Sequence, residues 1–166
     1  MKRIAGLGVM IVLALVQVTW APRISIAAAF PNLVLIAVVA ITWIQGVRAG
    51  LVWACIGGVL LDLTASGPIG PHALALLTVA YATSTWSRNF EGGNALHAAL
   101  TAAGGTAAYS LTLVVTESFL GMPGMDARTV VRLTIAAALY NAVLAPFALE
   151  ALRRWRALVR DAPAPA

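Results

Sequence analysis

One stretch, residues 57–72 (GGVLLDLTASGPIGPH), sets the strongest constraint on how the chain folds. Long apolar runs flank it on both sides, and a single carboxylate, Asp62, stands at the end of the first run. Gly67-Pro68 and Gly70-Pro71 break helices, because proline lacks a backbone donor and glycine adopts positive φ angles without a steric penalty. The stretch is typical of a membrane helix that ends, turns tightly and re-enters the bilayer.

The composition agrees with a membrane location. The 166 residues are 61% hydrophobic and only 10% charged, with a mean hydropathy of +0.90. Soluble domains carry about 25% charged residues, and a soluble fold of this size cannot hide so much apolar surface. We therefore expect one membrane domain, residues 1–160, and a disordered cytoplasmic tail, residues 161–166. The net charge of +5 would suit nucleic acid, but the positions of the basic residues argue against that partner.

The apolar runs predict an all-α integral membrane protein with six transmembrane helices. They cover residues 4–21, 30–44, 49–63, 69–86, 95–120 and 129–149. Pro31 is expected in the first turn of the second helix, where its missing donor has no cost, and Pro146 is expected to kink the sixth. A cleaved signal peptide ending near residues 27–29 is the alternative for the first run, but its length and Trp20 favour a retained span.

The basic residues predict the orientation in the membrane. With six spans both termini share one side, which holds eight of the eleven basic residues. These eight are Lys2, Arg3, Arg48, Arg88, Arg153, Arg154, Arg156 and Arg160, and the other three are Arg23, Arg128 and Arg132. Positive charge concentrates on the cytoplasmic side, so both termini are predicted to be cytoplasmic and Asp62 is predicted to lie toward the outer face.

Small residues at every fourth position indicate close helix packing. Two rows are present: Gly46, Gly50, Ala54 and Gly58 near and within the third span, and Ala98, Ala102, Thr106 and Ser110 in the fifth. Lipid supplies no hydrophobic force between helices, so small side chains that let backbones approach take on that role. Packing within the chain is the favoured interpretation, and a partner interface is the alternative. Tyr109, Tyr140 and Asn141 are expected to form interhelical hydrogen bonds.

The residues predict no catalytic, metal-binding or cofactor-binding site. His72 and His97 are expected in loops on opposite faces, and Cys55 lies within a span, so metal-ligand spacing is missing. No glycine-rich loop precedes a basic residue in the form that binds phosphate. Asp62 is expected near the outer edge, where an ion pair or a helix cap is the simplest role. Glu117 is expected at the same edge, Arg128 and Arg132 are candidate ion-pair partners for the two acids, and ion coupling is a less favoured alternative.

Several motifs between residues 31 and 86 occur together in order and spacing. They are Pro31-Asn32, Gly46 with Gly50, the run Gly57-Gly58-Val59-Leu60-Leu61-Asp62, and the turn Gly67-Pro68-Ile69-Gly70. In this combination the chain resembles the rod shape-determining MreD family of bacteria. It departs from the family pattern at Asn32, where an acid is frequent, and at Pro71, where the family usually has a non-proline residue.

The resemblance implies a non-enzymatic component of the elongation machinery in the bacterial inner membrane. Its implied partners are the bitopic membrane protein MreC and the glycosyltransferase–transpeptidase pair that builds lateral-wall peptidoglycan. The resemblance also implies a fold similar to the substrate-binding subunits of energy-coupling-factor vitamin transporters. A small-molecule-binding transporter subunit is therefore the alternative function, and a small membrane acyl- or phosphotransferase is a third.

The two main functions predict different interiors. A transporter subunit should enclose an outer-facing pocket lined with aromatic and polar groups. A scaffold should have a filled core and an exposed groove of small residues.

Overall fold

The computed structural model describes residues 2–20, 23, 30–65, 67–88 and 94–160, and these contain six helices and no strand. The helices are α1 (Lys2–Thr19), α2 (Leu33–Gln45), α3 (Val47–Thr64), α4 (Pro71–Ser87), α5 (Ala95–Phe119) and α6 (Ala127–Arg160). The predicted all-helical class is confirmed. Three helices, α3, α5 and α6, are long and apolar enough within the described residues to cross a membrane.

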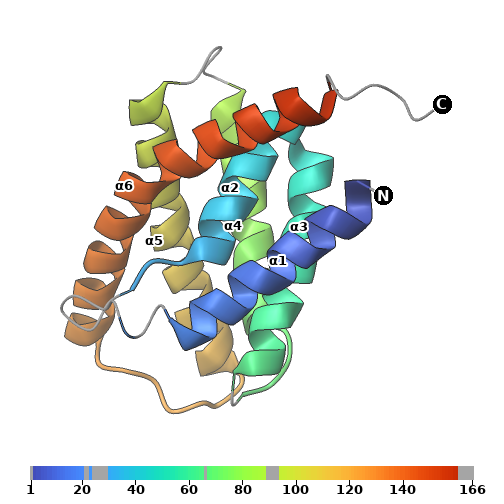
Figure 1. The fold of residues 1–166 in the computed structure, drawn as a ribbon. Helices are drawn as coiled ribbons and strands as arrows, with labels where there is room; N and C mark the ends of the chain where they lie inside the picture. Colours follow the sequence, from blue (N-terminus) through green and yellow to red (C-terminus); the bar gives the residue numbers. More distant parts are fainter. Residues whose placement is uncertain (1, 21–22, 24–29, 66, 89–93, 161–166) are drawn as a thin grey trace.

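The shortest helix, α2, lies at the centre of the bundle and contacts each of the other five helices. Its 13 residues extend only about 20 Å, and seven of them are buried. The main core joins α2 side chains such as Val34, Leu35 and Val38 to Leu76 and Val79 of α4. Figure 1 shows α3, α4 and α5 beside α2, with α1 crossing in front of them.

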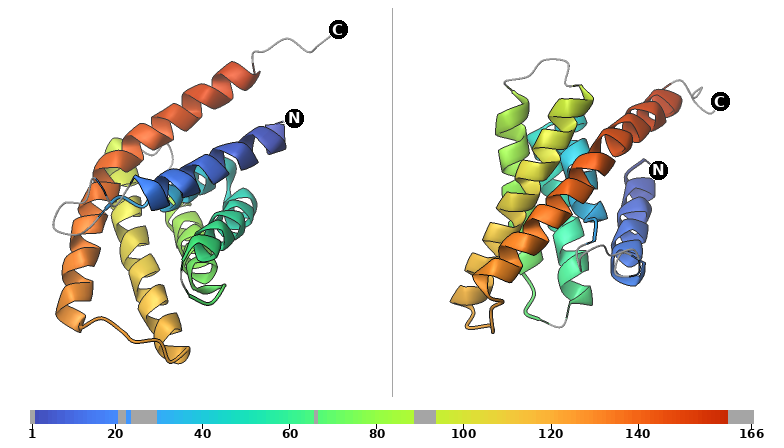
Figure 2. Two further views of the ribbon diagram at one scale, coloured as in Figure 1. Left: turned by 60° about the horizontal axis from the view of Figure 1, so that its bottom comes forward. Right: turned by 90° about the vertical axis from the view of Figure 1, so that its left-hand side faces the viewer.

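The C-terminal helix differs from the prediction. The span predicted over residues 129–149 lies within α6, but α6 is one helix of 34 residues that continues through Pro146 and the arginines after it. Figure 2 shows that its two halves point in different directions. Leu149 and Leu152 continue the helix because they pack on α2 and α5, next to Ala40 and Ala98.

Two proline positions also differ from the prediction. Helix α2 begins at Leu33, after the N-cap residue Asn32, so Pro31 precedes the helix and does not lie in its first turn. Helix α4 begins at Pro71 and not at residue 69, and here proline does occupy the first turn. Gly70, with a φ of 132°, makes the turn into α4, a conformation that favours glycine.

The start of α6 is set by a side-chain cap. Asp126 Oδ1 accepts the backbone N–H of Thr129 at 3.0 Å. Hydrogen bonds from Thr129 hold the pKa of the Asp126 carboxyl below its usual range. The expected tail at residues 161–166 and the alternative cleavage site at residues 27–29 lie outside the described residues.

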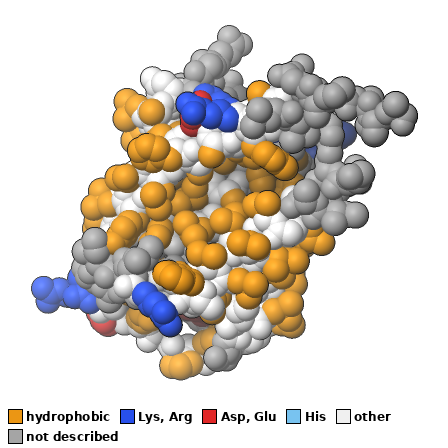
Figure 3. All heavy atoms as spheres, in the orientation of Figure 1, with side chains coloured by type: hydrophobic (Ala, Val, Ile, Leu, Met, Phe, Trp, Pro, Cys, Tyr) orange, Lys and Arg blue, Asp and Glu red, His pale blue; other side chains and the backbone are white. Residues whose placement is uncertain are grey.

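The surface has the distribution expected in a bilayer. On the face shown in Figure 3, hydrophobic side chains cover the middle, and Lys and Arg side chains lie toward the two ends. Large apolar side chains are exposed along the helices, with Leu111 at 66% and Phe147 at 70% of full exposure. Exposed apolar area on this scale indicates a surface that contacts lipid or another protein and not water.

Candidate functional site

The Asp62 side chain lies buried between the end of α3 and the start of α4. Its Oδ2 accepts the backbone N–H groups of Gly70 at 2.9 Å and Ala73 at 3.2 Å. Its Oδ1 accepts the backbone N–H of His72 at 2.9 Å and lies 2.9 Å from His72 Nδ1. A side chain of one helix therefore caps the next helix.

These hydrogen bonds to Asp62 explain how a carboxylate can be buried at the α3–α4 turn. The first N–H groups of a helix have no partner within the helix, and the helix dipole places partial positive charge there. A carboxylate that accepts several N–H bonds recovers the hydration that it loses on burial. Asp62 therefore holds the α3–α4 hairpin closed.

The helix cap, one of the two simple roles predicted for Asp62, is confirmed, and neither candidate ion-pair partner bonds to it. Asp62 pairs with His72 and the α4 backbone, not with Arg128 or Arg132. His72 lies in the first turn of α4 and His97 in the first turn of α5, so neither is in a loop. The sequence could not show this pairing, because it depends on how the turn over residues 65–70 folds back.

The glycine row of α3 lies inside the protein. A Cβ atom added at Gly58 would overlap the backbone of Ala73 on α4, and one added at Gly50 would overlap the Thr42 side chain on α2. Ala54 between them is fully buried. Gly46, with a φ of 83°, forms the turn between α2 and α3. These residues let α3 approach α2 and α4, which matches the favoured interpretation of packing within the chain.

Three residues of the second row, Ala98, Ala102 and Thr106, also lie in the interior, and the fourth, Ser110, is half-buried. Ala98 and Ala102 of α5 are buried, Ala98 beside Ala40 and Leu149 and Ala102 beside Ile36. Of the other motif residues, Gly57 faces Val34 and Met10 from α3. Gly67 and Pro68 lie in the α3–α4 turn, outside any helix.

A second polar cluster surrounds the first residues of α2. Asn141 Oδ1 accepts the N–H of Asn32 at 2.9 Å, and Gln17 Oε1 accepts the N–H of Leu33 at 2.7 Å. Asn32 Oδ1 accepts the N–H of Leu35 at 2.9 Å. Side chains from α1 and α6 thus satisfy the start of a helix that lies within the bundle.

This cluster extends to α5, and through it to the Asp62 cap. Asn141 Nδ2 donates to Thr106 Oγ1 at 2.8 Å, with both residues buried. The Tyr109 hydroxyl is hydrogen-bonded to the Asn32 side chain, and the Tyr109 ring meets the His72 ring edge-on at 6.2 Å between centroids. Tyr109 therefore stands between the N-termini of α2 and α4.

The structure confirms Asn141 as an interhelical hydrogen-bonding residue. It adds Gln17, which the sequence did not single out, and it shows that Thr106, predicted only as a member of the small-residue row, also bonds to Asn141. The sequence could have indicated a hydrogen-bonding role for Gln17, because it is the one amide side chain in the apolar run that forms α1. For Thr106 the row indicated close packing but not this hydrogen bond, since threonine in a membrane helix commonly bonds to its own backbone, as Thr106 does to the Ala102 carbonyl at 2.7 Å.

In both polar clusters the side chains form hydrogen bonds that join one helix to another. Within the described residues no three His, Cys, Asp or Glu side chains gather as metal ligands. Two open cavities, of about 310 and 240 Å³, lie on the α5–α6 side and away from the polar clusters. The smaller one is a groove with small residues in its wall, including Ala107, Ser110 and Thr134.

These features define the class: an α-helical membrane protein whose buried polar groups join helix ends and whose open cavities lie at its surface. The family described as rod shape-determining protein MreD matches residues 2–149, and the chain belongs to that family. Comparisons with curated proteins and with solved structures give no match. Family membership gives the chain a role in rod-shape determination.

Proposed function

We propose that this protein is a non-enzymatic scaffold of the rod-shape machinery, embedded in the bacterial inner membrane by six spans with both termini cytoplasmic. In this role it binds an MreC-like bitopic membrane protein and supports lateral-wall peptidoglycan synthesis. The glycosyltransferase and transpeptidase of elongation are further partners of the same assembly.

The observation that carries the proposal is the family match over most of the chain. The packing supports it. The core between α2 and α4 is filled by side chains such as Leu35 and Leu76, and the polar groups beside it are bonded to helix ends. A transporter subunit would need a pocket in this region, whereas the two cavities described above open on the α5–α6 surface.

The α5–α6 groove is the surface that we propose for the partner's membrane helix. Ala107 and Gly104 are exposed on α5, and a Cβ atom added at Gly104 would meet no other atom within 4 Å. Small exposed residues let a second membrane helix approach closely, and its side chains would fill the groove between Ser110 and Thr134.

The test is co-purification of the MreC-like partner, measured together with cell shape in a complemented deletion. Ala107→Phe fills the groove, and Ala82→Phe makes the same change at an exposed position of α4. We expect Ala107→Phe to lose partner and rod shape at a normal protein level, and Ala82→Phe to keep both. If the Ala107→Phe variant keeps both the partner and the rod shape, the groove is not the partner site. Normal rods in the deletion itself would refute the proposed function.

A further inference from the structure

Helix α6 changes direction near Pro146, and its C-terminal half stays at one end of the bundle. Glu150 shares the wall of an open cavity with Asn94, where α5 begins. Farther along, Arg156 Nη1 donates to the carbonyl of Ile44 at 3.1 Å, in the last turn of α2. Figure 1 shows the start of α5 and the end of α2 at the same end of the bundle. This half of α6 therefore contacts two helix ends in succession.

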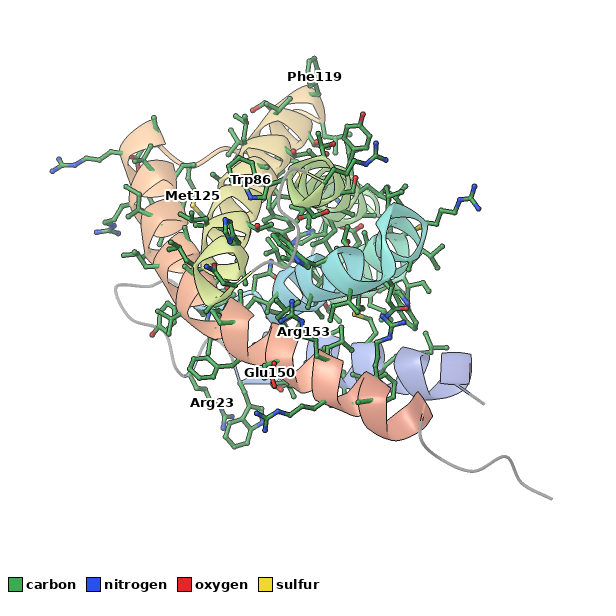
Figure 4. All side chains as sticks on the ribbon, turned by 90° about the horizontal axis from the view of Figure 1, so that it is seen from above. Arg23, Trp86, Phe119, Met125, Glu150 and Arg153 are labelled. Carbon is green, nitrogen blue, oxygen red and sulfur yellow. The ribbon has the colours of Figure 1, made fainter. Side chains whose placement is uncertain are left out.

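These contacts fix the direction in which α6 leaves the bundle. Over the six residues between the two contacts a helix advances about 9 Å. A helix that continued along the bundle would rise by that distance beyond the helix ends, but α6 remains beside them. Leu149 packs next to Ala40 of α2, and Leu152 packs against the same cluster. Figure 4 looks onto this end and shows the C-terminal half of α6 lengthwise, with Glu150 and Arg153 on it. This half therefore runs across the end of the bundle.

One exposed flank of this half is apolar and continues the exposed apolar surface of the N-terminal half. Leu139, Val143 and Phe147 are spaced four residues apart, and each is more than half exposed. Ala151 and Trp155 continue the same spacing past the bend and are also exposed, with Trp155 at 42%. A row at this spacing turns only about 40° around the helix axis per step. The apolar surface therefore passes from one half of α6 to the other.

The other exposed flank is polar. Arg154 Nε donates to Glu150 Oε1 at 2.7 Å, and both side chains are more than half exposed. Ala157 is exposed on the same flank, three positions after Arg154. Charged groups are costly in hydrocarbon, whereas tryptophan is enriched at the level of the lipid headgroups. An apolar flank with a tryptophan beside a charged flank is typical of a helix that lies in the plane of the membrane surface.

We propose that the C-terminal half of α6 is an interfacial helix that binds the surface of the bilayer next to the bundle. Trp155 lies among the lipid headgroups, the Glu150–Arg154 pair faces water, and Leu152 and Arg156 hold the helix against α2. Lipid is the occupant of the apolar flank, because this flank continues the apolar surface that α6 presents to the bilayer. The proposal requires a membrane location but not the shape-determining role, so the two can fail separately.

The test places a nitroxide spin label on the full-length protein in vesicles of phosphatidylethanolamine and phosphatidylglycerol, after Cys55→Ala removes the exposed native thiol. Ala151→Cys reports the apolar flank and Ala157→Cys the polar flank. The two exposed alanines form a matched pair that lies about 120° apart around the helix. Val143→Cys is the reference for lipid and Gly124→Cys the reference for water.

The measurement compares collisions of the label with oxygen, which concentrates in lipid, and with a nickel chelate, which stays in water. We expect oxygen collisions to exceed nickel collisions for Ala151→Cys, as for Val143→Cys, and the order to reverse for Ala157→Cys, as for Gly124→Cys.

Three results would overturn the proposal. An excess of nickel collisions at both alanine positions would show that this half of α6 extends into water. An excess of oxygen collisions at both would show that it is immersed in hydrocarbon. Few collisions with either reagent for Ala151→Cys would show that protein, such as a second copy of the chain, covers the apolar flank.

A second measurement needs no cysteine and applies if the labelled variants do not fold. Lipid brominated at the shallow end of its acyl chains quenches nearby tryptophan, and the emission of wild type minus that of Trp155→Phe isolates Trp155. We expect this difference to fall in brominated vesicles. A difference that bromination leaves unchanged would also overturn the proposal.

Discussion

Asp62 Oδ1 lies 2.9 Å from both the backbone nitrogen and Nδ1 of His72, so one carboxylate oxygen fixes the main chain and the side chain of a residue on the next helix. The other oxygen holds Gly70 and Ala73. A charge that would be costly at membrane depth is thereby used to close a helical hairpin.

Removing this cap should destabilise the protein. We expect Asp62→Leu to lower the free energy of unfolding by about 3 kcal/mol or more, because it leaves several buried N–H groups without an acceptor. Asp62→Asn keeps one acceptor oxygen and should lose less, about 1–2 kcal/mol. Thermal unfolding in detergent measures both changes. Equal stability of Asp62→Leu and wild type would contradict the capping role. Normal partner binding with complete loss of rod shape in Asp62→Asn would point to a function of the carboxylate beyond structure.

Two glycines should respond in opposite directions to the same change. Gly58→Ala should destabilise by about 1–3 kcal/mol, because the new methyl group meets the Ala73 backbone, which cannot move aside without shifting α4. Gly104→Ala has open space around its Cβ atom and should be neutral or stabilising by up to about 1 kcal/mol, since alanine favours a helix. The same unfolding assay compares them. Similar stabilities for the two variants would mean that Gly58 is not at a close helix crossing.

Asn141 should matter more than exposed polar residues of similar size. Asn141→Ala removes the acceptor for the Asn32 N–H and the donor to Thr106 in a buried site, so we expect a loss of about 1–2 kcal/mol. Ser118→Ala serves as the control, because the exposed Ser118 hydroxyl bonds only to the carbonyl of Val114 in its own helix. Hydrogen exchange at the start of α2 should rise in Asn141→Ala alone. If exchange there is unchanged, Asn141 does not secure that helix end.

The orientation in the membrane can be tested with reporter fusions. Fusions after Arg160 and after Ser87 should report a cytoplasmic location, and one after Gly124 an external one, because the proposed six-span topology places eight of the eleven basic residues on the side of the termini. An external C-terminus would be incompatible with six spans.

The sequence alone determined the class of fold. Periodic breaks in a strongly apolar chain indicate helices and fix roughly where each one lies, because only a helix satisfies its own backbone within lipid. The motifs from Pro31 to Gly70 were sufficient to suggest the family. The small residues Gly50, Ala54 and Gly58 indicated where helices approach each other, because close contact between backbones requires the absence of large side chains.

Only the tertiary structure decided which groups meet. The partner of Asp62 depends on the fold of the α3–α4 turn, and Gln17, Asn32 and Asn141 meet although they are distant in the sequence. The continuation of α6 past Leu149 likewise depends on its packing against α2 and α5, where local pattern indicated an end. Side-chain hydrogen bonds between helices form across distances that the sequence pattern does not encode, since periodicity reports the face of a helix but not the neighbour that the face meets.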